Sequence, residues 1–106
     1  MEQEYDICWD FDAGKQLKDI YEYIKKNASE NSARKIRNTI IDRIDELRKQ
    51  PERFPPEPLL SHRKENFRFI LVKPYKIIYE FVNQEVRILF IYSTRQNPNK
   101  ILDHFK

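Results

Sequence analysis

Basic side chains in the C-terminal half are the residues of this sequence best suited to chemistry. The first 50 residues carry 10 Lys and Arg against 11 Asp and Glu, whereas residues 51–106 carry 10 against 6. The net charge is +3. Cationic groups bind phosphate or acidic proteins, and they can stabilise a negatively charged transition state. The sequence therefore predicts a basic surface in the C-terminal half, although the same charges could simply keep the protein in solution.

Two residues that could transfer protons accompany these cations. His62 lies in the polar run Ser61–Asn66, and an unperturbed histidine titrates near neutral pH. Glu80 lies on a predicted strand and could act as a general base. Each has a plainer interpretation, because a loop histidine is usually just exposed and a strand glutamate usually forms a cross-strand ion pair. We find no Cys/His or acidic cluster with metal-ligand spacing, so we expect no metal and no other cofactor.

Apolar periodicity predicts the elements that must position these side chains. The alternating segment Tyr5 to Asp10 is typical of a half-buried strand. Apolar residues then recur every three or four positions in two stretches, which predicts two amphipathic helices joined as an antiparallel hairpin. The first stripe, within about 12–27, is Ala13, Leu17, Ile20 and Ile24, and the second is Ala33, Ile36, Ile40, Ile44 and Leu47. Ser29, Asn31 or Ser32 can cap the second helix, which Gln50-Pro51 ends.

Three β-rich segments follow a proline-rich connection. They span 67–72, 75–82 and 86–93, and their short connections predict an antiparallel meander, which the first strand joins beside a later strand. Residues 99–106 form a short helix or fray. The order predicts one α+β domain over residues 1–106, a twisted, largely antiparallel sheet with the helical hairpin across one face. Alternation groups Arg68, Lys76 and Glu80 on the other face, where solvent or a partner could reach them.

The sequence shows no sign of export or membrane insertion. Its start, Met1 to Asp6, is acidic and lacks the basic and apolar stretches of a signal peptide. No apolar run approaches the roughly 18 residues of a membrane span. We therefore expect a cytoplasmic protein without a membrane partner, and the single Cys8 can form no disulfide within the chain.

Taken in order, these patterns resemble the RelE/ParE toxin superfamily of bacterial type II toxin–antitoxin systems. Tyr5-x-Ile7-x-Trp9 and the two helical stripes look like the family's opening strand and helices. Phe67-Arg68 followed by the run 75–80 is similar to its aromatic-Arg and Tyr-Arg-Ile-x-Tyr strands. Residues 94–98, Thr-Arg-Gln-Asn-Pro, look like the end of a ParE-like plasmid-stabilisation subgroup. The resemblance covers residues 5–102.

This resemblance implies one of two activities on the same fold. RelE-like members are ribosome-dependent endoribonucleases that cut messenger RNA, whereas ParE-like members inhibit DNA gyrase. The resemblance places the ribonuclease's catalytic cations at Arg68, Lys76 and Arg95. Ile70 stands where ribonuclease members carry a second lysine, and no tyrosine follows Arg95. Lys76 replaces the commoner arginine and loses its bidentate fork.

These departures favour gyrase inhibition. The alternatives are mRNA cleavage, which would be metal-independent, and a non-toxic binding module or inactive relic that retains the fold. For either target, the predicted binding residues are Arg63, Lys64, Arg68, Lys76 and Arg95.

The resemblance also implies an antitoxin partner, which for a basic toxin should be a small acidic protein that folds on binding. We predict that an antitoxin helix covers Tyr21 and Ile41 on the helical hairpin. Arg37 and Lys100 would supply complementary charge. The alternative is that Tyr21 and Ile41 only widen the core stripe of the hairpin itself.

Overall fold

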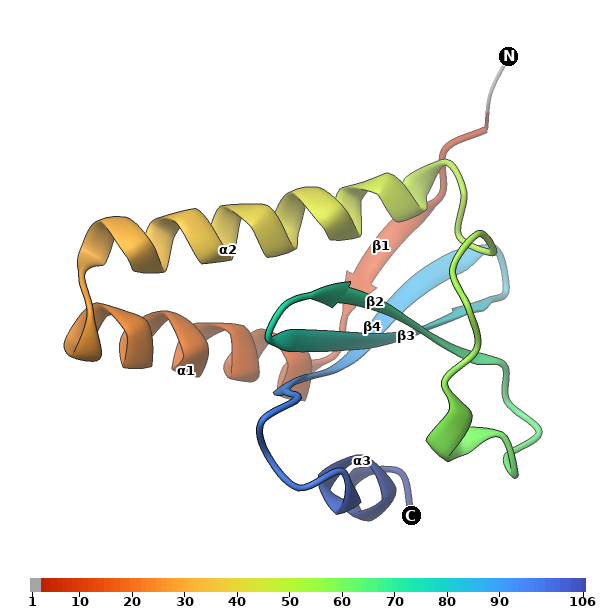
Figure 1. The fold of residues 1–106 in the computed structure, drawn as a ribbon. Helices are drawn as coiled ribbons and strands as arrows, with labels where there is room; N and C mark the ends of the chain where they lie inside the picture. The colour runs from red at the N-terminus through yellow and green to blue at the C-terminus, as the bar shows by residue number, and fades with distance from the viewer. Residues whose placement is uncertain (1–2) are drawn as a thin grey trace.

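The structure, a computed structural model, describes residues 3–106 as an α+β fold (Figure 1). Met1 and Glu2, the start of the acidic N-terminal stretch, lie outside the described residues. The elements in chain order are β1 (Asp6–Trp9), α1 (Phe11–Asn27), α2 (Glu30–Asp45), η1 (Glu46–Arg48), η2 (Pro58–Leu60), β2 (Phe67–Val72), β3 (Tyr75–Val82), β4 (Glu85–Ser93) and α3 (Asn99–His104). The predicted fold class and element order are confirmed, and the residues after the last strand do form a short helix.

The four strands form one mixed sheet in the order β1-β4-β3-β2. Strands β2, β3 and β4 are the predicted antiparallel meander, and β1 pairs in parallel with β4, as expected for a first strand that joins a later one. β1 has only four residues and reaches only the first part of β4, where Trp9 lies opposite Ile88. Within residues 3–106, the last part of β4 therefore has no neighbouring strand on that side.

The two long helices lie side by side as a hairpin across one face of the sheet, and their connected ends project beyond it (Figure 1). Only Ala28 and Ser29 separate them, fewer residues than the apolar stripes suggest. The Ser29 hydroxyl caps α2 by accepting the Ser32 backbone N–H at 3.0 Å, which satisfies one of the helix's unpaired donors. No helix within residues 3–106 is long and apolar enough to cross a membrane.

Burial of the two apolar stripes holds this hairpin on the sheet. Stripe residues such as Ala13, Ile40 and Ile44 are buried against β-strand residues such as Ile77 and Ile88. Removing this apolar area from water is the main favourable contribution to the fold. The core-facing stripes are therefore predicted correctly.

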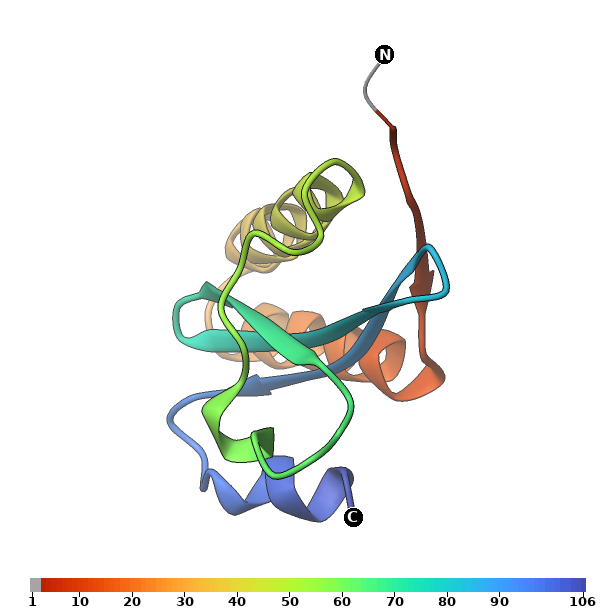
Figure 2. The ribbon, with the colours of Figure 1, turned by 90° about the vertical axis from the view of Figure 1, so that its right-hand side faces the viewer.

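A second core covers the opposite face of the sheet and corrects the expectation that this face is open. Leu60 of η2 and Ile101 of α3 are buried there against Phe67, Ile78 and Phe90. Figures 1 and 2 show η2 and α3 on the side of the sheet away from α2. The apolar residues of this face are thus buried by short elements that the periodicity of the sequence does not reveal.

Strand register also corrects the predicted grouping of Arg68 with Lys76. Lys73 and Pro74 form a two-residue turn, so Val72 lies directly opposite Tyr75 and shares its face. Even-numbered residues of β2 consequently share a face with odd-numbered residues of β3. Arg68 lies opposite Tyr79 on the hairpin face, whereas Lys76 lies on the other face. The prediction that Arg68, Lys76 and Glu80 share one face is wrong for Arg68.

Candidate functional site

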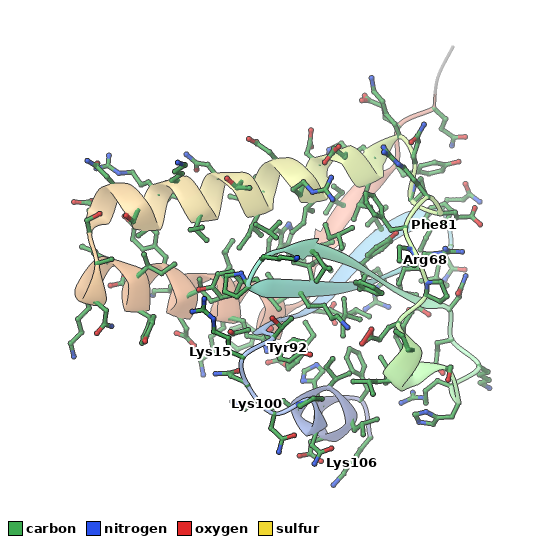
Figure 3. The ribbon with its side chains drawn as sticks, viewed as in Figure 1. Lys15, Arg68, Phe81, Tyr92, Lys100 and Lys106 are labelled. Atoms are coloured by element: carbon green, nitrogen blue, oxygen red, sulfur yellow. The ribbon has the colours of Figure 1, made fainter. Side chains whose placement is uncertain are left out.

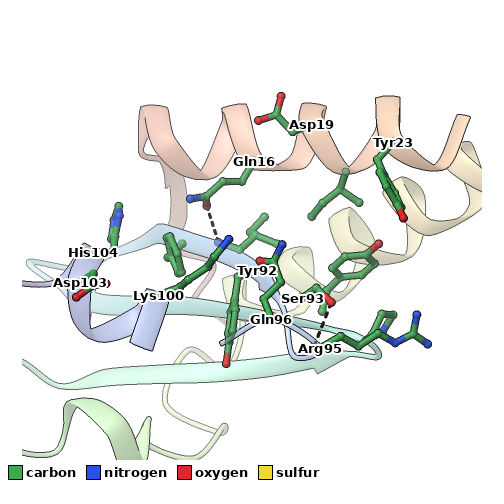
Figure 4. Close-up of a pocket in the computed structure, with 15 residues that line it drawn as sticks. Gln16, Asp19, Tyr23, Tyr92, Ser93, Arg95, Gln96, Lys100, Asp103 and His104 are labelled. Carbon is green, nitrogen blue, oxygen red and sulfur yellow. Dashed lines mark hydrogen bonds between the residues drawn. The ribbon is translucent and has the colours of Figure 1, made fainter. Parts of the chain in front are cut away.

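An open groove of about 910 Å³ lies beside the last part of β4, between α1 and α3 (Figure 4). It exists because β1 ends at Trp9, and α1 then crosses above the uncovered edge of β4. Where a longer β1 would have supplied a carbonyl, the Gln16 side chain of α1 accepts the Ile91 backbone N–H at 2.7 Å. The groove thus occupies the place beside β4 that a longer β1 would fill, and the Gln16 side chain takes over one of the hydrogen bonds of that strand.

Arg95 is the one residue of the predicted catalytic set that lines this groove. It follows β4 directly, and its backbone N–H donates to the Ser93 hydroxyl at 3.3 Å. Its side chain is exposed and forms no hydrogen bond or ion pair with any described residue. Burial raises the pKa of the neighbouring Tyr75 phenol, and the charge of Arg95 opposes this rise. Arg95 is therefore a cation available to a partner.

Lys76 is instead held in a buried ion pair with Glu57, which no pattern in the sequence predicts. Its Nζ lies 2.9 Å from both carboxylate oxygens of Glu57 and 4.4 Å from the centre of the Phe69 ring. The Glu57 side chain is 0% exposed and that of Lys76 15%. Within residues 3–106, Glu57 is the one charged residue that is buried. Lys76 thus neutralises a buried carboxylate and is not presented to a ligand.

Arg68 also has a structural partner, on the other face of the sheet. Its Nη1 donates to the Phe54 carbonyl at 2.6 Å, and the neighbouring Tyr79 hydroxyl donates to the Pro51 carbonyl at 2.6 Å. Burial raises the pKa of Tyr79 to about 12, against the opposing charge of Arg68. The two side chains fasten the proline-rich segment to β2 and β3. Figure 3 shows Arg68 well apart from Lys100.

The predicted loop residues His62, Arg63 and Lys64 do not line the groove. Arg63 pairs with Glu65, with an Nη2–Oε2 distance of 2.6 Å, and it also donates to the backbone carbonyl of Phe105 just after α3. The hydrogen bond from Arg63 lowers the pKa of Glu65. Arg63 therefore ties the loop to the end of α3, while His62 and Lys64 are exposed on that loop.

Glu80 does not reach the groove either. Its cross-strand neighbour is Arg87, but the Arg87 guanidinium forms its ion pair with Asp10 at 3.4 Å. The predicted cross-strand ion pair of Glu80 is thus replaced by a different pair. Burial raises the pKa of Glu80, and the nearby Arg87 charge opposes the rise.

The four predicted antitoxin contacts fall in two places. On the hairpin, the Arg37 guanidinium lies 4.9 Å from the centre of the Tyr21 ring, and Ile41 is 42% exposed. Lys100 instead lies on α3 and lines the groove. Tyr21 is half-buried beside Arg37, whereas Ile41 presents apolar surface to solvent.

Several residues that line the groove were missed from the sequence. Tyr23 is 67% exposed although it adjoins the apolar stripe of α1, and Gln16 looks like an ordinary polar helix position. His104 stacks on Phe90 with ring centres 4.3 Å apart. Figure 4 shows Tyr23 and Arg95 at one end of the groove and His104 at the other.

Comparison with known proteins agrees with this architecture. Residues 7–98 match the family model described as the ParE toxin of the type II toxin–antitoxin system parDE. A chain of the chromosomal ParDE toxin–antitoxin system from P. aeruginosa has a similar fold, with a TM-score of 0.72 and 18% identity over 85% of this chain and 96% of that chain. No curated protein matches the sequence significantly. Since the family model spans most of its residues, the chain belongs to the ParE toxin family of the RelE/ParE superfamily and is the toxin component of a type II toxin–antitoxin system, with an antitoxin as its partner.

Proposed function

We propose that this toxin arrests growth by inhibiting DNA gyrase and does not cut messenger RNA on the ribosome. The observation that carries the proposal is the state of the three cations that a RelE-like ribonuclease would use. Lys76 is bound by buried Glu57, and Arg68 donates to a backbone carbonyl on the opposite face of the sheet. Of the three, Arg95 alone has a side chain without a hydrogen-bond or ion-pair partner among residues 3–106, so it can contact a target.

Metal-independent RNA cleavage needs cations and a proton-transfer group that converge on one phosphodiester. Glu80 and His62 lie outside the groove that contains Arg95. His104 lines the groove but at its other end (Figure 4). The residues therefore lack the convergence that ribonuclease catalysis requires, whereas inhibition by binding requires only a complementary surface.

We propose that this groove, with Arg95 and Lys100, is the target-binding surface. Both cations are exposed and line the groove, Arg95 directly after β4 and Lys100 on α3. Lys64 is exposed on the loop before β2 but lies outside the groove. We assign no direct target contact to Arg63, Arg68 and Lys76, which support target binding only by stabilising the fold.

Two readouts on the same protein test the proposed function. Purified toxin should reduce ATP-dependent supercoiling of relaxed plasmid by gyrase, and induced cells should keep ribosome-bound mRNA intact. Arg95→Ala should weaken gyrase inhibition by about tenfold, the effect of losing one charge-assisted contact. Lys106→Ala is the matched control, because Lys106 is an exposed cation that does not line the groove. Growth arrest with cut mRNA and normal supercoiling would contradict the proposal, and failure to arrest growth would indicate an inactive relic.

We further propose that the antitoxin covers the hairpin surface around Tyr21, Arg37 and Ile41. Ile41→Asp should weaken antitoxin binding because it places a charge in an apolar contact. Leu71→Asp is the matched control, since Leu71 on β2 is 39% exposed, close to the 42% of Ile41. Hydrogen exchange should show protection of α1 and α2 in the complex. Equal weakening by both variants, or unchanged exchange in the two helices, would contradict this binding mode.

A further inference from the structure

The groove exposes a free edge of the sheet as well as side chains. Ile91 directs its backbone N–H away from β3 and into the groove, where Gln16 accepts it. The N–H and C=O of one strand residue point to the same side, so the Ile91 carbonyl faces the groove as well. Ser93, two residues on, has the same orientation, and its carbonyl already accepts the Gln96 N–H at 3.0 Å. Within residues 3–106 no partner is recorded for the Ile91 carbonyl or the Ser93 N–H on this side of β4, so both can pair with a ligand.

The Ile91 carbonyl and the Ser93 N–H have the spacing that pairs with one residue of a parallel strand. That residue would donate its N–H to the Ile91 carbonyl and accept the Ser93 N–H with its own carbonyl. β1 already runs parallel to β4 and ends with the Asp10 N–H donating to the Ile88 carbonyl at 2.9 Å. An extended peptide in the groove would therefore continue the line of β1 along β4.

The side chains at one end of the groove fit a carboxylate. The Arg95 guanidinium has no partner among the described residues, and the hydroxyls of Tyr23 and Tyr75 donate no hydrogen bond within residues 3–106. Tyr23 and Arg95 lie at the same end of the groove (Figure 4). A carboxylate placed there would accept from a guanidinium and two phenols, and charge-assisted hydrogen bonds of this kind are the strong ones.

The balance of charge along the groove favours a protein segment over a nucleic acid. Asp19 on α1 and Asp103 on α3 line the same groove as Arg95 and Lys100. A nucleic acid brings a phosphate at every residue and would meet both carboxylates, whereas nucleic-acid sites are predominantly positive. A peptide brings isolated charges, main-chain groups for the edge of β4, and apolar side chains for the walls formed by Ile20 and Phe90.

We infer that the groove binds an extended segment of the target protein that adds to β4 as a parallel strand and places one acidic side chain on Arg95, Tyr75 and Tyr23. The inference rests on the proposed function, because it names the part of gyrase that the toxin recognises: a protein segment and not the bound DNA.

Photocrosslinking within the toxin–gyrase–DNA complex tests the inference. Tyr23 is replaced by p-benzoylphenylalanine, and Phe11, 82% exposed and outside the groove, receives the same replacement as the control. The Tyr23 probe should crosslink to one gyrase segment that contains Asp or Glu, and the Phe11 probe should not reach that segment. Crosslinks to DNA, or equal labelling of the segment by both probes, would overturn the inference.

Exchanging the charges of Arg95 and of its acidic partner in gyrase then tests whether these two residues are in contact. Arg95→Glu should weaken gyrase inhibition by about a hundredfold, and Tyr75→Phe, which removes only the hydroxyl, by up to about tenfold. Replacing the crosslinked acidic residue of gyrase by Arg should restore inhibition by Arg95→Glu. Lys106→Glu should change inhibition less than twofold. Inhibition that persists in both groove variants, each checked for thermal stability, refutes the peptide site alone, whereas absence of any gyrase inhibition refutes the proposed function itself.

Discussion

Removing one partner of the Glu57–Lys76 ion pair should destabilise the fold more than removing both. Lys76→Met leaves a carboxylate with 0% exposure and no cation, and breaking a buried pair in this way costs about 3–5 kcal/mol. Glu57→Leu should cost less, because the 15% exposed Lys76 can turn its ammonium toward water. The double variant Glu57→Leu/Lys76→Met replaces both charges by apolar groups and should lie within about 1 kcal/mol of the original protein.

Urea unfolding monitored by circular dichroism measures these free energies, and thermal unfolding gives a second scale. For a domain of this size, each kcal/mol corresponds to about 4–8 °C in Tm, so Lys76→Met should lower Tm by more than about 12 °C. The double-mutant cycle should give an interaction free energy of at least about 2 kcal/mol between the two residues. Single variants that each cost under about 1 kcal/mol and add in the double variant would refute the ion-pair argument.

The same double variant separates structure from function. If Lys76 only stabilises the fold, the folded double variant should keep the gyrase inhibition that we propose for the original protein. A folded double variant that no longer inhibits growth would mean that Lys76 meets the target, and the ribonuclease interpretation would regain support.

Three further changes test the roles assigned to polar residues on the sheet. Arg68→Met should cost about 1.5–3 kcal/mol in urea unfolding, because it removes the charged hydrogen bond to the Phe54 carbonyl, and it should leave gyrase inhibition per folded molecule unchanged. The Tyr79 pKa, about 12 when folded against 10.0 for the free phenol, means that its stabilising contribution is complete below pH 10 and disappears as the pH rises toward 12; stability curves of the original protein and Tyr79→Phe should converge over that interval. Because the pKa of Glu80 is raised in the folded state, the folded state loses stability as the pH rises from about 4.5. Glu80→Gln should therefore be more stable than the original protein at pH 7, on the order of 0.5 kcal/mol, and should lose this advantage near pH 4. An equal advantage at both pH values would contradict the argument.

Most of the fold could be predicted because it depends on local patterns. The stripe that contains Ile40 and Ile44 repeats with the period of a helix and is buried as expected. The predicted face of Arg68 is wrong because alternation within each strand does not show which face of β2 matches which face of β3. The two-residue turn at Lys73-Pro74 sets the pairing between the two strands, and this register decides which side chains share a face.

The site was harder to predict because it depends on contacts between distant segments. The family resemblance singles out Arg95 as a basic residue beyond the last strand, but Gln16 and Tyr23 become groove residues only because α1 packs beside β4. Glu57 pairs with Lys76 across 19 positions and an irregular proline-rich segment, for which no periodic pattern exists.

The short C-terminal helix is one reason why we place the target-binding surface at the edge of the sheet. The family match ends at residue 98, and α3 begins at Asn99. With η2, α3 buries the sheet face beside Lys76 through Ile101 and Leu60, and it supplies Lys100 to the groove. A target that approaches this face would first have to displace a buried apolar contact, whereas a target that approaches the edge meets Arg95 and an unpaired length of β4 directly. The same helix therefore closes the sheet face that carries Lys76 and completes the groove in which we place the protein target.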